Sequence, residues 1–244
     1  MNTERPIRLD RLLANLGYAT RAAARALLEE GRVYINGAPE KNGARTIPAQ
    51  DFDTIRVDGE ALDHPDGIFV LLHKPAGYAC SHNPKEAPLV YDLLPARWMR
   101  RNPQPESIGR LDRDTTGLLL ITDRLDLVHR LASPKHALEK VYLAEVEKTG
   151  PELDASLTAL FAGGSIRLDG EDKPCLPARL VITGKRQARL TLHEGRFHQV
   201  KRMFAACGYK VCALHRESFG PYTLEGLEEG QYKTQTPPRG SGRE

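Results

Sequence analysis

The pattern of apolar residues predicts two short helices and a hairpin at the start of the chain. The segment RLDRLLANLG at 8–17 places leucine at the i, i+3, i+4 and i+7 positions of one helix face, and Gly17 is suited to ending that helix. RAAARALLEEG at 21–31 predicts a second helix with Thr20 as its N-cap. RVYING then alternates apolar and polar residues before Asn-Gly, a pair typical of two-residue hairpin turns, and TIRVDGE predicts another strand.

The rest of the chain predicts more strands than helices. GLLLITD is apolar without interruption, which is typical of a strand covered on both faces. IFVLLHK, KVYLAEVE, the two halves of ARLVITGKRQARLTLHEG and YKVCALHRESF predict further strands. RLDLVHRLASP predicts a helix with Leu125, Val128 and Leu131 inward, stopped near Pro134. We therefore expect an α+β fold in which helices are inserted among strands.

One further helix is predicted by RFHQVKRMFAACG near the end of the chain. Phe197, Val200, Phe204 and Cys207 would share its apolar face, and Lys201 would flank that face.

Composition shifts divide the chain into parts. The segment ALDHPDG at 61–67 is polar, contains proline and glycine, and is predicted to be a linker. It would separate a small module at 1–60 from a larger domain at 68–235. The tail at 236–244 is predicted to be disordered.

Composition and charge narrow the class of protein. The 244 residues contain no apolar run long enough to span a membrane and no leader-like start, and the four cysteines suggest reduced thiols in the cytoplasm. Cys207 and Cys212 with His215 or His198 match no usual zinc spacing, so we expect buried or half-buried thiols and no metal. The net charge is only +3, but Lys185 to Arg202 hold six cations and one anion. Such a patch suits a polyanion, although ordinary solvated side chains would give the same pattern.

The first sixty residues resemble the S4 RNA-binding domain along TRAAARALLEEGRVYINGAPEKNGARTI and DTIRVDGE. The resemblance implies that the second helix and the hairpin meet structured RNA. It makes Arg21, Arg25 and Arg32 candidate phosphate contacts. The alternative is a solvated helix face. Because this module has nine cations and nine anions, its RNA surface would have to be a local patch.

Four further motifs, in order, resemble those of pseudouridine synthases. They are HKPAGY at 73–78, GRLDRDTTGLLLITD at 109–123, EKVYLAEV at 139–146 and EGRFHQVKRMF at 194–204. The arrangement is closest to the ribosomal small subunit pseudouridine synthase A family, which modifies one uridine of 16S rRNA. The resemblance implies a mixed, mainly antiparallel sheet with flanking helices, and no cofactor, because isomerising uridine involves no redox change. It also implies a ribosomal RNA partner, either as free RNA or within an assembling small subunit, and we expect a monomer without membrane contact.

The same resemblance implies the catalytic roles. Asp112 matches the essential aspartate and would act on the ribose, either by attacking C1′ or by helping to remove the 2′ proton. A carboxylate in a pocket needs a positive partner to stay ionised, and Lys201 matches the basic residue that provides one. Tyr142 matches the tyrosine that stacks on the uracil and could help to move the C5 proton. Arg110 matches the arginine that enters the RNA stack as the base flips out.

Other residues are assigned to substrate or RNA binding by their place in these motifs. Asp114 is a tempting second acid, but the position is variable in the family pattern. We therefore expect it to support a turn or pair with a neighbouring arginine. The remaining candidate contacts are Lys74, Arg196, His198 and Gln199. With Pro75 and Gly77, Lys74 would position the other wall of the pocket. His198 and Gln199 would serve structure or RNA contact and not proton transfer.

Three alternatives stay open. A large-subunit rRNA synthase of the same family would commonly carry Asn-Arg where this chain has His198 and Gln199. An S4-type factor that only binds RNA would not need to carry Asp112, Tyr142 and Lys201 together. A sugar hydrolase would need a second placed acid.

Overall fold

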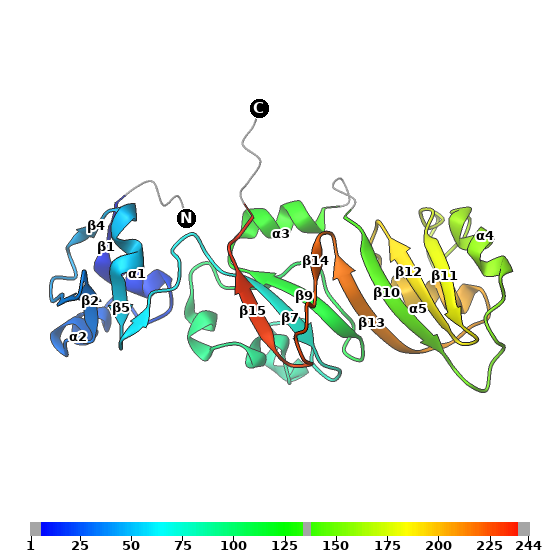
Figure 1. Cartoon of the computed structure of the whole chain (residues 1–244), viewed down its shortest axis with the longest axis horizontal. Helices are drawn as coiled ribbons and strands as arrows, with labels where there is room; N and C mark the ends of the chain where they lie inside the picture. Colours follow the sequence, from blue (N-terminus) through cyan, green and yellow to red (C-terminus); the bar gives the residue numbers. More distant parts are fainter. Residues whose placement is uncertain (1–5, 134–137, 239–244) are drawn as a thin grey trace, which may run out of the picture.

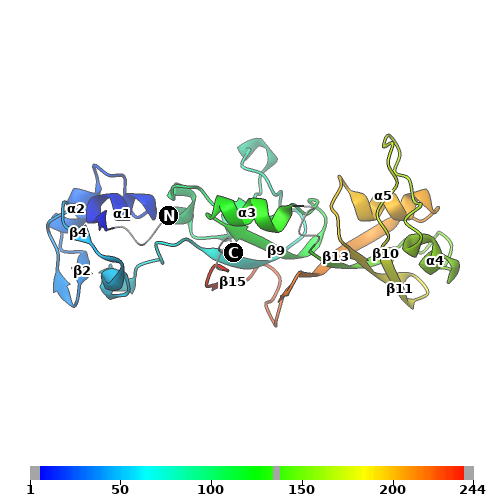
Figure 2. The ribbon, with the colours of Figure 1, turned by 90° about the horizontal axis from the view of Figure 1, so that it is seen from above.

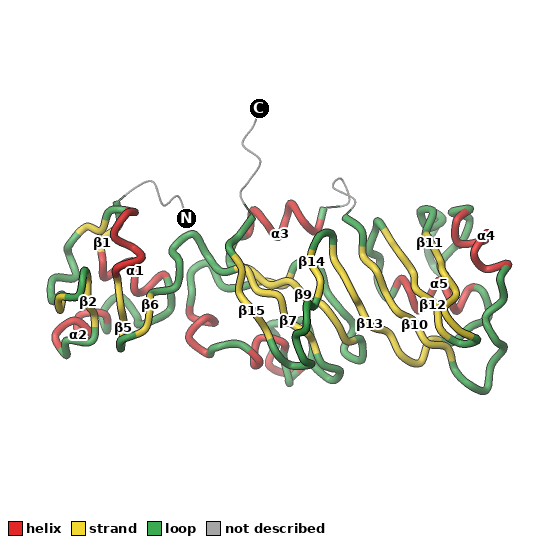
Figure 3. Tube along the Cα trace, in the orientation of Figure 1, coloured by secondary structure: helices red, strands yellow, loops and turns green. Residues whose placement is uncertain are grey.

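The computed structural model describes residues 6–133 and 138–238, and it confirms the α+β class. A small N-terminal module and a large sheet follow one another along the long axis of the molecule (Figures 1 and 2). The larger part contains more strand than helix, and its helices are short (Figure 3). A search for a helix long and apolar enough to cross a membrane finds none among the described residues.

The N-terminal module has a hydrophobic core of its own. The four leucines of the first predicted helix are fully buried and pack against apolar residues of the second helix and the strands. Asn36 and Gly37 have φ of 53° and 79°, which confirms the Asn-Gly turn. The second helix is shorter than predicted and begins at Ala24, after a turn. The elements are β1 Ile7–Arg8, α1 Leu9–Asn15, α2 Ala24–Glu29, β2 Val33–Ile35, β3 Ala38–Pro39, β4 Thr46–Ile47, the 3-10 helix η1 Ala49–Thr54, β5 Ile55–Val57 and β6 Glu60–Ala61.

The larger part is built on a nine-stranded sheet with the order β11-β12-β10-β13-β9-β7-β15, to which β14 and β8 add short pairings. The β13–β9 pair is parallel and the other pairs are antiparallel, as the family resemblance implied. The strands are β7 Phe69–Lys74, β8 Glu106–Ser107, β9 Thr116–Thr122, β10 Lys140–Val146, β11 Arg179–Gly184, β12 Gln187–Leu192, β13 Val211–Phe219, β14 Tyr222–Thr223 and β15 Tyr232–Gln235. The helices are η2 Pro84–Glu86, η3 Val90–Leu93, η4 Ala96–Arg100, α3 Leu125–Ala132, α4 Ser156–Ala162 and α5 Gln199–Ala206.

The apolar run of β9 is buried because both faces of the sheet are covered. Leu119 belongs to a core shared with α4, α5 and η4, whereas Leu118 and Leu120 belong to a second core that includes residues of α3. The prediction that Leu125 points inward is wrong, since Leu125 is exposed and Leu127 is the fully buried residue of α3. Val128 and Leu131 do pack against the second core, as predicted.

The segment predicted as a linker is firmly held. Asp63 accepts hydrogen bonds from Arg97, from the Trp98 indole at 2.9 Å and from Arg101 at 3.0 Å. Gly17 lies against the same helix η4, and a Cβ on this glycine would meet the Arg97 carbonyl oxygen at 2.2 Å. The two parts of the chain are therefore joined by a packed contact, and the segment 61–67 is not a free tether.

The expectations for the end of the chain and for the thiols are tested or met only in part. Residues 236–238 carry no helix or strand, and the rest of the predicted tail lies outside the described residues. Cys175 is buried and Cys80 and Cys207 are half-buried, but Cys212 is exposed, which corrects the expectation for that thiol.

Candidate active site

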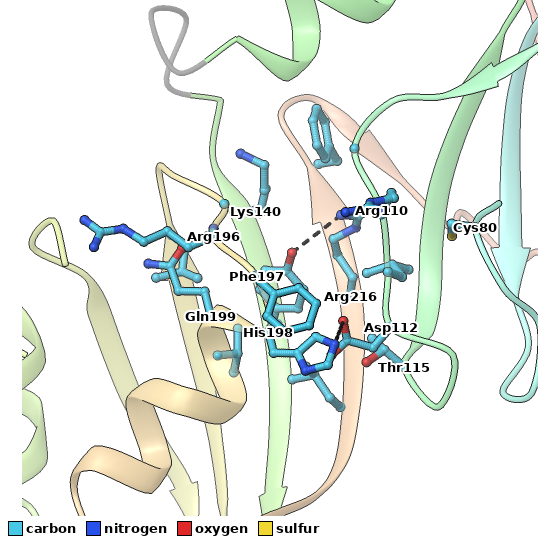
Figure 4. A pocket seen from close by; sticks show the side chains of 18 of the residues that line it. Cys80, Arg110, Asp112, Thr115, Lys140, Arg196, Phe197, His198, Gln199 and Arg216 are labelled. Carbon is cyan, nitrogen blue, oxygen red and sulfur yellow. Dashed lines mark hydrogen bonds and ion pairs between the residues drawn. The ribbon is translucent and has the colours of Figure 1, made fainter. Parts of the chain in front are cut away.

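A cavity of about 530 Å³ opens where four segments of the larger domain meet. The loop before β9 forms one wall, and the turn before α5 forms the wall opposite (Figure 4). Strands β10 and β13 contribute Tyr142 and Arg216. The cavity therefore gathers three of the four motifs of the sequence around one space.

The loop that carries Asp112 is fixed from behind by Lys74. The Lys74 ammonium donates to the carbonyl oxygens of Pro75 at 3.0 Å, Arg113 at 3.1 Å and Thr115 at 2.8 Å. The Lys74 side chain is fully buried, and burial lowers its pKa. The buried ammonium therefore positions the loop, which agrees with the expected role of Lys74 in positioning a wall of the pocket, and it has no exposed surface for the direct RNA contact that was also expected.

Gly117 sets the approach of the loop to the sheet. Its φ is +108°, and a Cβ at this position would meet the backbone of Arg216 on β13 at 2.3 to 2.8 Å. Only glycine fits this close parallel contact. The glycine of the motif therefore brings the strand after Asp112 against β13.

Asp112 lies between two basic side chains. Its Oδ1 is 3.3 Å from His198 Nε2, and its Oδ2 is 3.3 Å from Lys201 Nζ. The Asp112 side chain is 22% exposed, so the carboxylate remains reachable from the cavity. A reachable carboxylate with a fixed cation beside it can attack, or stabilise, an electron-poor carbon.

Lys201 also pairs with Asp114, and more closely. The Lys201 Nζ–Asp114 Oδ1 distance is 2.6 Å, so the expected arginine partner of Asp114 is instead a lysine 87 residues away. This contact holds the pKa of Asp114 below its usual value. Burial acts to lower the pKa of Lys201, but Asp114 and Asp112 outweigh it and the pKa is raised. Lys201 is therefore a stable positive charge.

Tyr142 lies at the base of the cavity and is only 9% exposed. It faces Arg216 across the β10–β13 pairing, and Arg216 donates from Nη1 to the Tyr142 hydroxyl at 3.5 Å. The Arg216 side chain is fully buried. The sequence reasoning missed Arg216, although one signal was present. Strand alternation puts Arg216 on the same face as buried Leu214, where a solvated arginine is not expected.

Two known family models match this chain. Residues 68–206 match the family model described as RNA pseudouridylate synthase, and residues 7–52 match the S4 domain. The chain belongs to the RNA pseudouridylate synthase family. It is thus an enzyme that isomerises uridine in RNA, and the alternative of a factor that only binds RNA falls away.

Relatives cover nearly the whole chain. The protein named ribosomal small subunit pseudouridine synthase A from Pasteurella multocida (strain Pm70) is 40% identical over 93% of this chain and 95% of its own. The protein of that name from Escherichia coli (strain K12) is 39% identical over 94% of this chain and 96% of its own. A crystal structure described as pseudouridylate synthase matches with 38% identity and a TM-score of 0.63, covering 94% of this chain and 96% of that one.

The segment before α5 differs from its predicted form. Helix α5 begins at Gln199, and His198 has φ of 47°, so Phe197 is not on the apolar helix face as predicted. Phe197 is 69% exposed and stacks on the His198 ring with centroids 3.8 Å apart. In this pseudouridylate synthase the stacked pair flanks the opening of the cavity beside Asp112.

Arg196 and Gln199 brace this segment. Arg196 donates to Glu171 at 2.8 Å and to Glu194 at 3.1 Å. Gln199 is buried; it accepts from the Arg196 backbone at 2.8 Å and donates to Glu194 at 2.6 Å. Their polar groups hold the turn in shape, which is the structural one of the two roles expected for Gln199, whereas Arg196 was expected only as a substrate or RNA contact.

The arginines of the S4 domain lie on its surface. Arg25 is 84% exposed and pairs with Glu29 at 2.8 Å. Arg21 is 63% exposed, 4.0 Å from Asp10. Arg32 is held by Asp58 at 2.7 Å and by Glu30. Arg21 and Arg25 are therefore the more available of the three.

Replacing Asp114 by asparagine is expected to change stability by less than about 1 kcal/mol, because the Asp114 side chain is 73% exposed. The pKa of Asp114 is lowered by folding, so its contribution exists above pH 3.8 and fades as the pH falls further. Urea unfolding of the parent and of Asp114→Asn at pH 7 and pH 3 measures this. A difference that grew at pH 3 would contradict the assignment.

Proposed function

We propose that this enzyme converts one uridine of 16S rRNA to pseudouridine, with Asp112 as the nucleophile. The observation that carries the proposal is the reachable Asp112 carboxylate held between Lys201 and His198, above a buried tyrosine. The small-subunit target is supported by relatives at 39–40% identity that carry this name along nearly their full length. We expect the enzyme to act as a monomer in the cytoplasm.

The chemistry requires one bond to break and one to form. The N1–C1′ bond breaks with its electron pair on the uracil, and the ribose becomes electron-poor at C1′. Asp112 either bonds to C1′ or accepts the 2′ proton. The uracil then turns and C5 bonds to C1′, while the Asp112–C1′ bond breaks or the 2′ proton returns to C2′. C5 then loses its proton and N1 gains one, so the product is an isomer of the substrate. The Lys201 ammonium lies 3.3 Å from the Asp112 carboxylate, where it offsets the negative charge of the free carboxylate.

Tyr142 and Arg110 would handle the base itself. Stacking on an aromatic ring is worth about 1–3 kcal/mol per base, enough to offset part of the cost of flipping the target out of its stack. Tyr142 offers a buried ring at the cavity base. Arg110 is exposed at the cavity rim, where it can enter the space that the base leaves.

Pseudouridine mapping of both ribosomal RNAs tests the target. Cells with and without this protein are compared by chemical labelling of pseudouridine. The expected result is the loss of a single site in 16S rRNA. Loss of a 23S site instead would replace the proposed target with the large-subunit alternative, and no loss in either RNA would reject both.

We propose that residues 1–60 capture RNA through Arg21 and Arg25. The double substitution Arg21→Gln with Arg25→Gln is expected to weaken 16S fragment binding uniformly and to reduce the slope of log affinity against log salt by about 2. The single-turnover rate at saturating RNA should stay unchanged, because neither residue lies near the cavity. Arg56→Gln, which removes an arginine from the module's sheet, is the control. An unchanged salt slope in the double variant would refute the role.

A further inference from the structure

Two arginines are almost fully buried among the described residues, and their surroundings differ. Arg101 is 4% exposed and is paired with Asp63 at 3.0 Å and with Asp123 at 2.7 Å. Arg216 is 1% exposed, and no ion pair joins it to a carboxylate in the part of the chain that the structure describes. A buried cation without a counter-charge is costly, because burial removes its hydration and nothing replaces it.

The partners that Arg216 does have are neutral. Nε donates to the Leu118 carbonyl at 2.7 Å and Nη1 to the Tyr142 hydroxyl at 3.5 Å. Nη2 is buried and has no hydrogen-bond partner within residues 6–133 and 138–238. Within the same ranges, Arg101 Nη2 also lacks a partner but lies outside the cavity, whereas the Thr115 hydroxyl, which likewise lacks one, lines the same cavity as Arg216. The lining of the cavity thus carries the full positive charge of Arg216 and two polar groups that lack hydrogen-bond partners.

A second cation strengthens the positive field. Lys140 lines the cavity, and its ammonium lies 5.0 Å from the Phe219 ring, while the Arg216 guanidinium lies 5.2 Å from the same ring. The pKa of Lys140 is lowered, first by burial and then by the charge of Arg216. Asp112 already has Lys201 and His198, so these two cations are not needed to keep it ionised. Figure 4 places Arg216 in the same part of the cavity as Asp112 and Arg110.

The reaction itself produces the missing negative charge. When the N1–C1′ bond breaks, both electrons stay with the uracil, which becomes an anion with charge shared among N1, O2 and O4. This holds whether Asp112 attacks C1′ or accepts the 2′ proton. A fixed positive charge in a dry cavity stabilises a developing anion far more than it would in water.

We propose that Arg216 is the counter-charge of the departing uracil anion. The guanidinium holds the detached base electrostatically beside Tyr142 while the base turns from N1 to C5, and it returns to a neutral environment once C5 has bonded to C1′ and the anion has been protonated. The delocalised charge of the guanidinium suits an anion that rotates, because no single atom pair must be kept. This inference rests on the proposed function and adds a leaving-group role to it.

The test compares two RNAs in single-turnover reactions at saturating enzyme. One is a 16S fragment with uridine at the mapped position, and the other carries 5-fluorouridine there, whose base is more acidic and leaves more easily. Loss of the N-linked nucleoside is followed by nuclease digestion and chromatography. Arg216→Gln is expected to slow the uridine reaction by about 10²–10³-fold. With the fluorinated RNA, the loss of rate caused by Arg216→Gln should be at least about tenfold smaller, because its leaving group depends less on the counter-charge.

Matched variants separate this role from a structural one. Arg101→Gln removes an equally buried arginine outside the cavity, and any loss of rate should be the same with both RNAs. Arg216→Lys keeps the charge and should lose less rate than Arg216→Gln. If Arg216→Gln does not fold, the same comparison is made on Arg216→Lys. The lysine charge lies at a different place, so this variant should still be slower on the uridine RNA, and the loss of rate should be smaller on the 5-fluorouridine RNA.

Two results would overturn the inference. One is a folded Arg216 variant with equal losses on both RNAs, which would indicate a structural or RNA-binding role. The other is full activity of Arg216→Gln on the uridine RNA. Failure of the parent chain to convert the uridine fragment would count against the proposed function instead, and it is seen before any variant is measured.

Discussion

Asp112→Asn is expected to abolish pseudouridine formation while leaving RNA binding intact. The amide is nearly the same size as the carboxylate, but it is a poor nucleophile and a poor proton acceptor. Removing the nucleophile of an enzyme typically costs 10⁴-fold or more in rate, on the order seen when acyl-transfer nucleophiles are removed. Tritium release from a 16S fragment labelled at C5 of uridine measures the rate, and filter binding measures the affinity.

The control for this substitution is Asp126→Asn. Asp126, like Asp112, is a carboxylate next to a basic side chain, here Arg124, but it is more exposed, lies at the start of α3 and does not line the cavity. Its loss should leave tritium release unchanged. Full tritium release by Asp112→Asn would reject the proposed mechanism, whatever the control shows.

Lys201→Met is the second substitution with a large expected effect. It removes the ammonium that lies 3.3 Å from Asp112 and leaves that carboxylate with His198 alone. Loss of one fixed charge in an active site typically lowers kcat by about 10²–10³-fold. KM should change little, because Lys201 is engaged with two carboxylates and is not free to hold RNA. Lys201→Arg should restore much of kcat.

The pH dependence follows from the direction of the Lys201 shift. Its pKa is raised above 10.5 by Asp114 and Asp112, against the effect of burial. A group with a raised folded pKa contributes its stability below the unfolded value and loses it only as the pH rises through the folded one. Rate profiles of the parent and Lys201→Arg between pH 6 and pH 9.5 should therefore have the same shape. A drop confined to the parent above pH 8 would show that Lys201 loses its proton there.

Helices and strands that follow one simple spacing were predictable. The leucines of α1, the Asn-Gly turn and the apolar run of β9 all lie where the pattern placed them, because local conformation and burial agree at these sites. Leu125 and Phe197 were placed wrongly because they lie at or just before the start of a helix. Each helical residue turns the side-chain direction by about 100°, so the spacing of apolar residues does not determine the direction of a side chain where the helix has only begun.

The chemistry of single motifs was predictable, and the family resemblance also implied the pairing of Asp112 with Lys201, but other contacts between motifs were not predictable. Lys74 was included among the expected substrate or RNA contacts, yet its ammonium donates to the carbonyl of the next residue and to two carbonyls of the loop that carries Asp112. Arg196 and Gln199 brace their own turn for a similar reason. Whether a cation meets water, a carbonyl or a carboxylate depends on the neighbours that folding supplies.

By itself the sequence determined the α+β class, the order of the motifs and the residue types available for catalysis, because these depend on local spacing and side-chain chemistry. Only the tertiary structure decided which further charges meet. Lys201, which the resemblance paired with Asp112, also meets Asp114 because α5 packs beside the loop before β9. Arg216 has no carboxylate partner among the described residues, and its Nε donates to the Leu118 carbonyl instead. Electrostatic interactions depend on distance and burial in space, and spacing along the chain specifies neither.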